Sequence, residues 1–125
     1  MAHPDVLIVD DDRLLRAMLR DALADVPCSV REVDSGDAAL AAVNEKTPSV
    51  LLLDLVMPGR SGLDLLKVFT ERKLPTHIVV ISSLDTESLV QQALRDGAHG
   101  FLTKPFHPLD VQNVVRAALE GAAAS

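Results

Sequence analysis

Strand-like and helix-like patterns alternate five times along this chain of 125 residues. Short runs of aliphatic residues, such as Val6–Val9 and Val50–Leu53, predict strands that are buried on both faces. Each run is followed by a segment with apolar residues at every third or fourth position, which is typical of an amphipathic helix. The alternation predicts an α/β fold, in which right-handed crossovers join a parallel sheet that has helices on both faces.

The expected elements can be placed from their composition and from the residues that would end them. We expect strands at 6–9, 29–33, 50–53, 78–81 and 100–103, and helices at 13–25, 36–44, 63–72, 86–96 and 108–119. Candidate N-caps are Asp12, Asp34 or Ser35, and Asp85 or Thr86. Residues 1–120 are expected to form one domain, and residues 121–125 a loose tail or the start of a linker.

Composition narrows the class of protein. The net charge is -6, with 18 acidic against 12 basic residues, which argues against direct nucleic-acid binding by this domain. A single cysteine, Cys28, rules out an intrachain disulfide and is interpreted as a small apolar residue. The apolar runs are shorter than the roughly 20 residues of a membrane helix, and residues 1–5 lack the basic start of a secretory signal. We therefore expect a cytoplasmic location and no membrane contact.

Several common sites are absent from the sequence. The four histidines are scattered, and the cysteine has no CxxC partner, so a zinc site is not expected. There is also no GxGxxG or GxxxxGK[ST] pattern, which argues against a dinucleotide or P-loop nucleotide site.

Polar residues follow four of the five predicted strands at the point where each strand ends. They are Asp10 and Asp11, Asp54, Ser82 and Lys104. In an open parallel sheet these ends share one edge, which is where ligands bind. Three carboxylates favour a hard cation, Mg²⁺ or Mn²⁺, over zinc, and a lysine with a hydroxyl suits a phosphoryl group. The set predicts phosphoryl chemistry assisted by a metal ion.

The same residues carry a family resemblance. The segments Val6–Asp11, Leu53–Gly59 and Phe101–Phe106 closely resemble, in order and spacing, the motifs of the CheY-like receiver domain of two-component response regulators. The resemblance spans essentially the whole chain. It implies a flavodoxin-like (βα)5 fold with strand order 2-1-3-4-5.

The resemblance assigns a role to each residue of the cluster. It implies that Asp54 is the phosphoacceptor, whose carboxylate becomes an acyl phosphate. It implies that Asp10 and Asp11, with Asp54 and the backbone carbonyl of Val56, hold Mg²⁺. After phosphorylation, Ser82 and Lys104 are expected to contact the phosphoryl oxygens, and the bond from Lys104 to Pro105 is usually cis in this family.

A conformational switch is also implied. In the family, the residue equivalent to Ser82 moves toward the phosphoryl group and an aromatic residue, here Phe101, turns inward. The surface that changes would be formed by residues 86–96, 100–103 and 108–119. Phe101 also fits a plain core position, because a phenylalanine in a strand is more often core than switch.

The partners implied are a histidine kinase or a histidine phosphotransfer protein as the donor, and an output domain or protein as the receiver of the signal. The same surface could also pair two copies after phosphorylation, and no sequence feature decides this. The protein would assist its own phosphorylation and dephosphorylation without being an enzyme in the ordinary sense.

Two other functions are compatible with parts of the pattern. One is a receiver fold that acts as a constitutive interaction module, against which the intact set of five site residues argues. The other is a Mg²⁺-dependent phosphatase of the haloacid-dehalogenase kind, which needs Thr or Val where this chain has Leu14. Acidic residues are also favoured at the N-terminus of a helix, which would explain some of the residues Asp10–Asp12 without a metal site.

Two apolar residues depart from what family members often have. Val56 and Leu84 stand two residues after Asp54 and Ser82, at places where polar groups flank the route of the hydrolytic water. Neither side chain can orient a water molecule. We hypothesise that the phosphoryl group is lost slowly.

Overall fold

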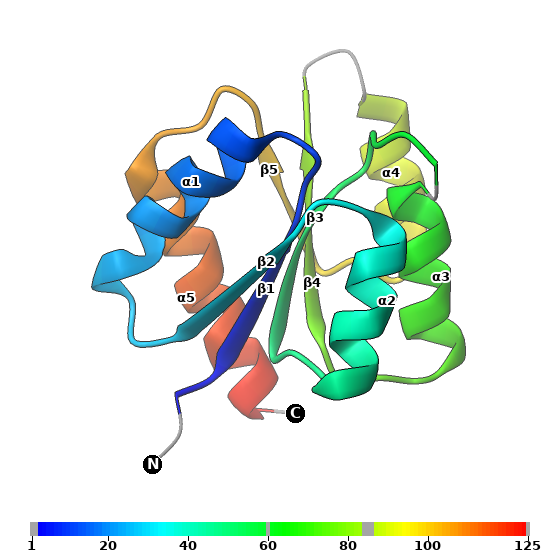
Figure 1. Cartoon of the computed structure of the whole chain (residues 1–125), viewed down its shortest axis with the longest axis horizontal. Helices are drawn as coiled ribbons and strands as arrows, with labels where there is room; N and C mark the ends of the chain where they lie inside the picture. The colour runs from blue at the N-terminus through cyan, green and yellow to red at the C-terminus, as the bar shows by residue number, and fades with distance from the viewer. Residues whose placement is uncertain (1–2, 60, 84–86, 125) are drawn as a thin grey trace.

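A five-stranded parallel sheet lies between two layers of helices in the computed structural model, which describes residues 3–59, 61–83 and 87–124 (Figure 1). The strands are β1 (Asp5–Val9), β2 (Ser29–Val33), β3 (Val50–Asp54), β4 (His77–Ser82) and β5 (Gly100–Thr103). Their order in the sheet is β2-β1-β3-β4-β5, and all four neighbouring pairs are parallel. The predicted flavodoxin-like fold is confirmed.

The helices divide unequally between the two faces of the sheet, as Figure 1 shows. One face is covered by α1 (Arg13–Ala22), continued by the short 3₁₀ turn η1 (Leu23–Asp25), and by α5 (Pro108–Ala124). The other face is covered by α2 (Gly36–Glu45), α3 (Gly62–Glu71) and α4 (Glu87–Arg95). Alternate strand residues enter the two layers, so Leu7 and Leu51 face α2, α3 and α4, while Ile8 and Leu52 face α1 and α5.

The expected elements match the observed ones, with two clear differences, of which the first is at the first helix. The regular α1 ends at Ala22, and the last three residues of the expected helix form η1 instead. Val26 is extended, with φ -102° and ψ 131°. The reason is Pro27, because a residue that precedes proline is pushed out of the helical region.

The C-terminal end differs from expectation in the opposite sense. Residues 121–124, expected to be loose, continue α5 as far as Ala124. Alanine is the strongest helix former, which favours this extension. Gly121 also packs closely on β4, since a Cβ built there would stand 2.5 Å from Cε1 of His77. The helix thus rests on the start of β4.

Two of the predicted N-caps are observed. The carboxylate of Asp12 accepts hydrogen bonds from the backbone N–H groups of Leu14 and Leu15 at the start of α1. At α2 the cap is Ser35, whose Oγ accepts from the N–H of Ala38 at 3.1 Å, and not Asp34. The candidate caps Asp85 and Thr86 lie outside the described residues, as does Leu84.

Cys28 is half-buried and packs against the core beneath α1 and α5, which agrees with its interpretation as a small apolar residue.

Within the described ranges, no helix has both the length and the hydropathy needed to cross a bilayer. β1 begins and α5 ends at the lower end of the sheet in Figure 1, and the strands run upward from there. The carboxyl ends of the strands therefore meet at the opposite end.

Candidate functional site

The five predicted site residues meet at the carboxyl edge of the sheet. The registers pair Val9 with Leu53 and Asp54 with Ile81, so β1, β3 and β4 end close to one level. At the far side, Ser82 pairs with Thr103, and the N–H of Lys104 donates to the carbonyl of Ser82 at 2.7 Å. Parallel pairing therefore brings together residues that are far apart in the chain.

Asp10 is fully buried although it carries a carboxylate. Its N–H donates to the carbonyl of Val33 at 3.2 Å, which continues the β1–β2 ladder by one residue. Its Oδ1 accepts from the N–H of Asp12 at 2.9 Å. Its Oδ2 has no hydrogen-bond partner among the described residues. Burying a carboxylate oxygen without a hydrogen-bond partner costs free energy, and a cation bound beside it would offset that cost.

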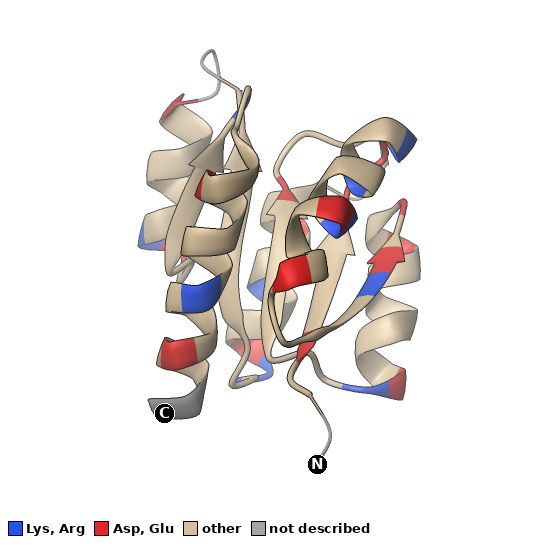
Figure 2. Ribbon diagram, turned by 90° about the vertical axis from the view of Figure 1, so that its left-hand side faces the viewer, with Lys and Arg blue, Asp and Glu red and all other residues tan. Residues whose placement is uncertain are grey.

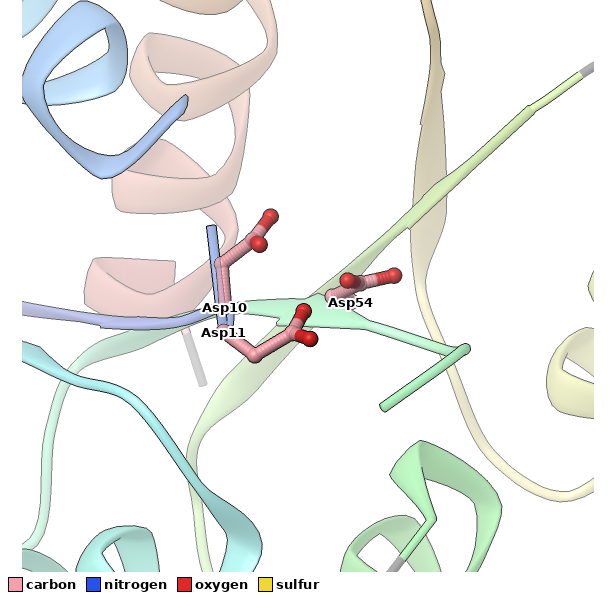
Figure 3. A group of neighbouring side chains, drawn as sticks. All are labelled: Asp10, Asp11 and Asp54. Atoms are coloured by element: carbon pink, nitrogen blue, oxygen red, sulfur yellow. The ribbon is translucent and has the colours of Figure 1, made fainter. Parts of the chain in front are cut away.

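Three carboxylates form the centre of the site. Oxygens of Asp10, Asp11 and Asp54 all lie within 4.8 Å of one another. Figure 3 shows that Asp10 and Asp11 come from the end of β1, and Asp54 from the end of β3 beside them. Asp54 is 4 % exposed, and its Oδ1 accepts from the N–H of Val56 at 3.1 Å. Asp11 is exposed and opens the group to solvent.

Lys104 is the cation next to this group. Its Nζ lies 3.9 Å from Oδ2 of Asp10 and 3.9 Å from Oδ2 of Asp54. These distances are too long for hydrogen bonds, so the lysine balances the two charges without binding tightly to either. The Lys104–Pro105 peptide bond is cis.

Two of these carboxylates, Asp54 and Asp10, have raised pKa values. Burial raises the pKa of Asp54 to about 6, and the neighbouring charge of Asp10 adds to that rise. The N–H of Val56 and the charge of Lys104 act in the opposite direction. Burial also raises the pKa of Asp10, against the hydrogen bond from Asp12. The single positive charge of Lys104 thus compensates only part of the negative charge of the neighbouring aspartates.

The site is an open cavity of about 380 Å³. Its lining is formed by Asp10, Asp11, Asp12, Asp54, Val56, Ser82, Ser83 and Lys104. The residues fit a hard divalent cation for two reasons that the geometry supplies. All the donors are oxygens within 4.8 Å of one another, and a buried oxygen of Asp10 lacks a partner. The cavity also leaves room for a phosphoryl group.

A second cavity, of about 280 Å³, adjoins the site between β4, α4 and β5. Ser82 lines both cavities and is buried, with 4 % exposure. Phe101 stands at the second cavity with 53 % of its surface exposed. The core interpretation of Phe101 is therefore wrong for this conformation.

Two residues that contribute to the site were not predicted from the sequence. Asp12 lines the cavity and holds Asp10 through its N–H, a role that its cap pattern did not suggest. Arg16 donates from Nη1 to the backbone carbonyl of Asp10 at 2.8 Å. Its only sequence signal is a basic residue on the second turn of an amphipathic helix, which usually means a solvated face.

Comparisons with known proteins identify the family. Residues 6–116 match the model of the response regulator receiver domain. The chemotaxis protein CheY of Halobacterium salinarum is 31% identical over 110 residues, which cover 88% of this chain and 92% of that protein. The chain therefore belongs to the response regulator receiver domain family of two-component signalling.

Longer regulators contain the same unit. The DNA-binding transcriptional regulator NtrC of Salmonella typhimurium is 37% identical over 81% of this chain, which spans 22% of NtrC. A crystal structure of NtrX from Brucella abortus superposes with a TM-score of 0.91 at 32% identity, over 99% of this chain and 28% of that one. This chain thus covers nearly all of CheY but about a quarter of these regulators.

Proposed function

We propose that this chain is a Mg²⁺-dependent phosphoacceptor, and that Asp54 receives a phosphoryl group from a phosphohistidine of a histidine kinase or histidine phosphotransfer protein. One observation carries the proposal. The buried carboxylate of Asp54 shares a cavity with Asp10, Asp11 and Lys104, so four charged groups meet at the carboxyl edge of the sheet. Membership of the receiver family supports the same reading.

The N–H of Val56 fixes Oδ1 of Asp54, which leaves Oδ2 as the nucleophile. Oδ2 forms a bond to phosphorus as the phosphorus–nitrogen bond to the donor imidazole breaks, and the imidazole keeps the electron pair. With a pKa of about 6, Asp54 is mostly ionised at pH 7 and ready to attack. Lys104, 3.9 Å from Oδ2, supplies positive charge where the phosphoryl oxygens arrive.

Asp10, Asp11 and Asp54, with the backbone carbonyl of Val56, would hold Mg²⁺, and Mn²⁺ could substitute for it. When bound, the ion supplies neutralisation of the negative charge that gathers on the phosphoryl oxygens. The N–H of Val56 orients the acceptor carboxylate and Lys104 supplies charge beside it, so the protein would assist its own phosphorylation and dephosphorylation.

The switch would use the second cavity. The phosphoryl group itself carries about -1.5 to -2 charges at pH 7 and has three acceptor oxygens, which attract the hydroxyl of Ser82. Movement of Ser82 would free space in the cavity of about 280 Å³, and Phe101 would turn into it from its exposed position. The phosphoryl group would thereby bias a pre-existing equilibrium toward the repacked arrangement of α4, β5 and α5.

The repacked surface would contact an output domain or an output protein, or a second phosphorylated copy. Direct nucleic-acid binding is not proposed for this domain. Lys and Arg are interspersed with Asp and Glu over the face in Figure 2, and the net charge is -6. NtrC is named as DNA-binding, but this chain spans only 22% of it.

The proposal is tested by intact mass after incubation with acetyl phosphate, with and without Mg²⁺. We expect one phosphoryl adduct that requires Mg²⁺ and is missing in Asp54→Ala. A parallel titration with beryllofluoride, followed by backbone NMR, should move signals from α4 and β5. No adduct and no response to beryllofluoride would contradict the proposal and favour a constitutive interaction module.

A further inference from the structure

The side chain of Arg16 reaches back from α1 to the start of the β1–α1 loop. Its Nη1 donates to the backbone carbonyl of Asp10 at 2.8 Å. Its Nε donates to Oε1 of Glu32 in β2 at 3.1 Å. The side chain is only 14% exposed, and both contacts are partly buried. The planar guanidinium therefore ties the main chain of a carboxylate residue in the site to a neighbouring strand.

The anchor for this contact is rigid. Glu32 pairs with Ile8 in the β1–β2 ladder, so its backbone is fixed within the sheet. Hydrogen bonds from Arg20 and Arg16 hold the pKa of Glu32 below its usual range, which keeps it ionised at neutral pH. An ionised acceptor on a rigid strand fixes the direction of the Arg16 fork.

Arg16 completes the restraint on Asp10. The N–H of Asp10 is held by Val33, its Oδ1 is held by the N–H of Asp12, and its carbonyl is held by Arg16. Of the polar atoms of Asp10, only Oδ2 is left without a hydrogen bond among the described residues. That oxygen lies 3.9 Å from Nζ of Lys104, which is also 3.9 Å from Oδ2 of Asp54. The loop thus presents one oxygen and restrains the rest of the residue.

We infer that Arg16 is a positioning residue for the divalent-cation site: by clamping the Asp10 carbonyl to Glu32, it preorganises the β1–α1 loop that presents Asp10 and Asp11. The inference rests on the proposed function, which requires that cation. Arg16 is not among the residues that line the cavity in which the cation and the phosphoryl group would sit. Residues that orient metal ligands in this way typically contribute about 10- to 100-fold to metal affinity.

Charge and positioning predict opposite effects when Arg16 is removed. Loss of a positive charge near three carboxylates should strengthen cation binding by a small, salt-screened amount. Loss of the clamp should weaken it, because the loop must then be ordered when the cation binds. The sign of the change therefore separates the two explanations.

Arg20 provides a matched control. It lies one turn further along α1 and shares Glu32, to which its Nε donates at 2.6 Å. Its other hydrogen bond goes to the carbonyl of Val30 at 3.5 Å. Arg20→Ala thus removes the same charge and a contact to the same glutamate, without removing a contact to Asp10.

The experiment is a calorimetric titration of Mg²⁺ into wild type, Arg16→Ala, Arg16→Lys and Arg20→Ala. We expect Arg16→Ala to weaken Mg²⁺ binding by about tenfold or more. We expect Arg16→Lys to fall between it and wild type, because a lysine keeps the charge but cannot bridge Asp10 and Glu32. Arg20→Ala should stay within about twofold of wild type. If Arg16→Ala does not fold, Arg16→Lys carries the comparison.

A second readout uses the metal-free protein. The N–H of Asp12 is held by Oδ1 of Asp10, so its hydrogen exchange reports whether the loop is ordered. We expect faster exchange at Asp12 in Arg16→Ala and not in Arg20→Ala, at a temperature where both are folded. A purely structural role for Arg16 would lower the melting temperature of Arg16→Ala and leave exchange at Asp12 unchanged while the variant is folded.

The outcomes separate the two proposals. Wild type that binds no Mg²⁺ and forms no phosphoryl adduct would overturn the proposed function. Wild type that binds Mg²⁺, together with an Arg16→Ala variant that binds it as tightly as Arg20→Ala, would overturn the positioning role alone. Unchanged exchange at Asp12 in Arg16→Ala would also overturn it.

Discussion

Gly62, the first residue of α3, lies directly against the main chain of Asp54. A Cβ built at Gly62 would stand 2.5 Å from the carbonyl oxygen of Asp54 and 2.7 Å from Cα of Leu55. Both neighbours are backbone, which cannot swing away as a flexible side chain can. The absence of a side chain at this position therefore lets α3 begin against the strand end that presents the acceptor.

Gly62→Ala should accordingly disturb the site and not only the core. The added methyl group must push α3 away from β3, which we expect to cost about 1–3 kcal/mol of unfolding free energy and to slow phosphorylation of Asp54. Urea unfolding and the rate of adduct formation measure the two effects. Gly100→Ala is the control, because a Cβ there meets nothing within 4 Å. Equal behaviour of the two variants would refute the packing argument.

The pKa of Asp54 predicts a pH-dependent effect of Asp54→Asn in metal-free protein. Burial raises the pKa of Asp54 from 3.8 to about 6. Above pH 6 the folded protein carries a buried charge that the unfolded chain solvates, so wild type should be less stable than Asp54→Asn. As the pH falls from 7 to 4, the carboxyl takes up a proton and this difference should shrink. A difference that stays constant over that range would contradict the shifted pKa.

Val56 should control the lifetime of the phosphoryl group. Its side chain is 56% exposed at the edge of the cavity and cannot orient an attacking water. We expect Val56→Asn to speed dephosphorylation severalfold, and Val56→Leu to leave the rate unchanged. The decay of the adduct after removal of the donor measures this. Leu84 is the other apolar residue of the hypothesis, and the double variant Val56→Asn with Leu84→Glu tests both positions together. An unchanged dephosphorylation rate in the double variant would contradict the hypothesis.

His99 should make the fold sensitive to acid at the end of the sheet remote from the site. Its Nδ1 accepts from the N–H of Ile78 at 3.0 Å, and its ring stacks on His77 with 4.0 Å between centroids. Burial, with the nearby His77, lowers the pKa of His99 from 6.5. The stability due to neutral His99 is therefore present above pH 6.5 and lost as the pH falls through that value toward the lowered pKa.

His99→Asn tests that expectation, because an Asn oxygen can accept the same hydrogen bond without titrating. Urea midpoints of wild type and His99→Asn should differ by a constant amount above pH 7. Below pH 6.5 wild type should lose stability faster than the variant. His107→Asn, at an exposed position, should follow wild type throughout. Parallel curves for wild type and His99→Asn would show that His99 does not titrate abnormally.

The fold was predictable from sequence because its signals are local and repeated. Aliphatic runs, helical periodicity and caps such as Asp12 are all read within a few residues, and the parallel order follows from their alternation. The end of α5 was not predictable in this way. Residues 121–124 look like a loose tail in isolation, and it is contact between Gly121 and His77 that brings the helix end onto the sheet.

The candidate site was predictable for a similar reason, because each of its residues directly follows or ends a strand. What sequence could not reveal is how those residues are supported. The clamp from Arg16 to Asp10 depends on a side chain crossing from α1 to the loop, and the clearance at Gly62 depends on how close α3 lies to β3. Both are three-dimensional relations that leave no periodic trace in the sequence.

The central claim, that Asp54 accepts the phosphoryl group, is tested most directly by reductive trapping. Borohydride cleaves an acyl phosphate and leaves homoserine at the residue that carried it, which peptide mass spectrometry then locates. After treatment with acetyl phosphate, we predict homoserine at position 54 alone, and only when Mg²⁺ is present. Homoserine at position 10 or 11, or an adduct that survives reduction on another residue type, would contradict the account.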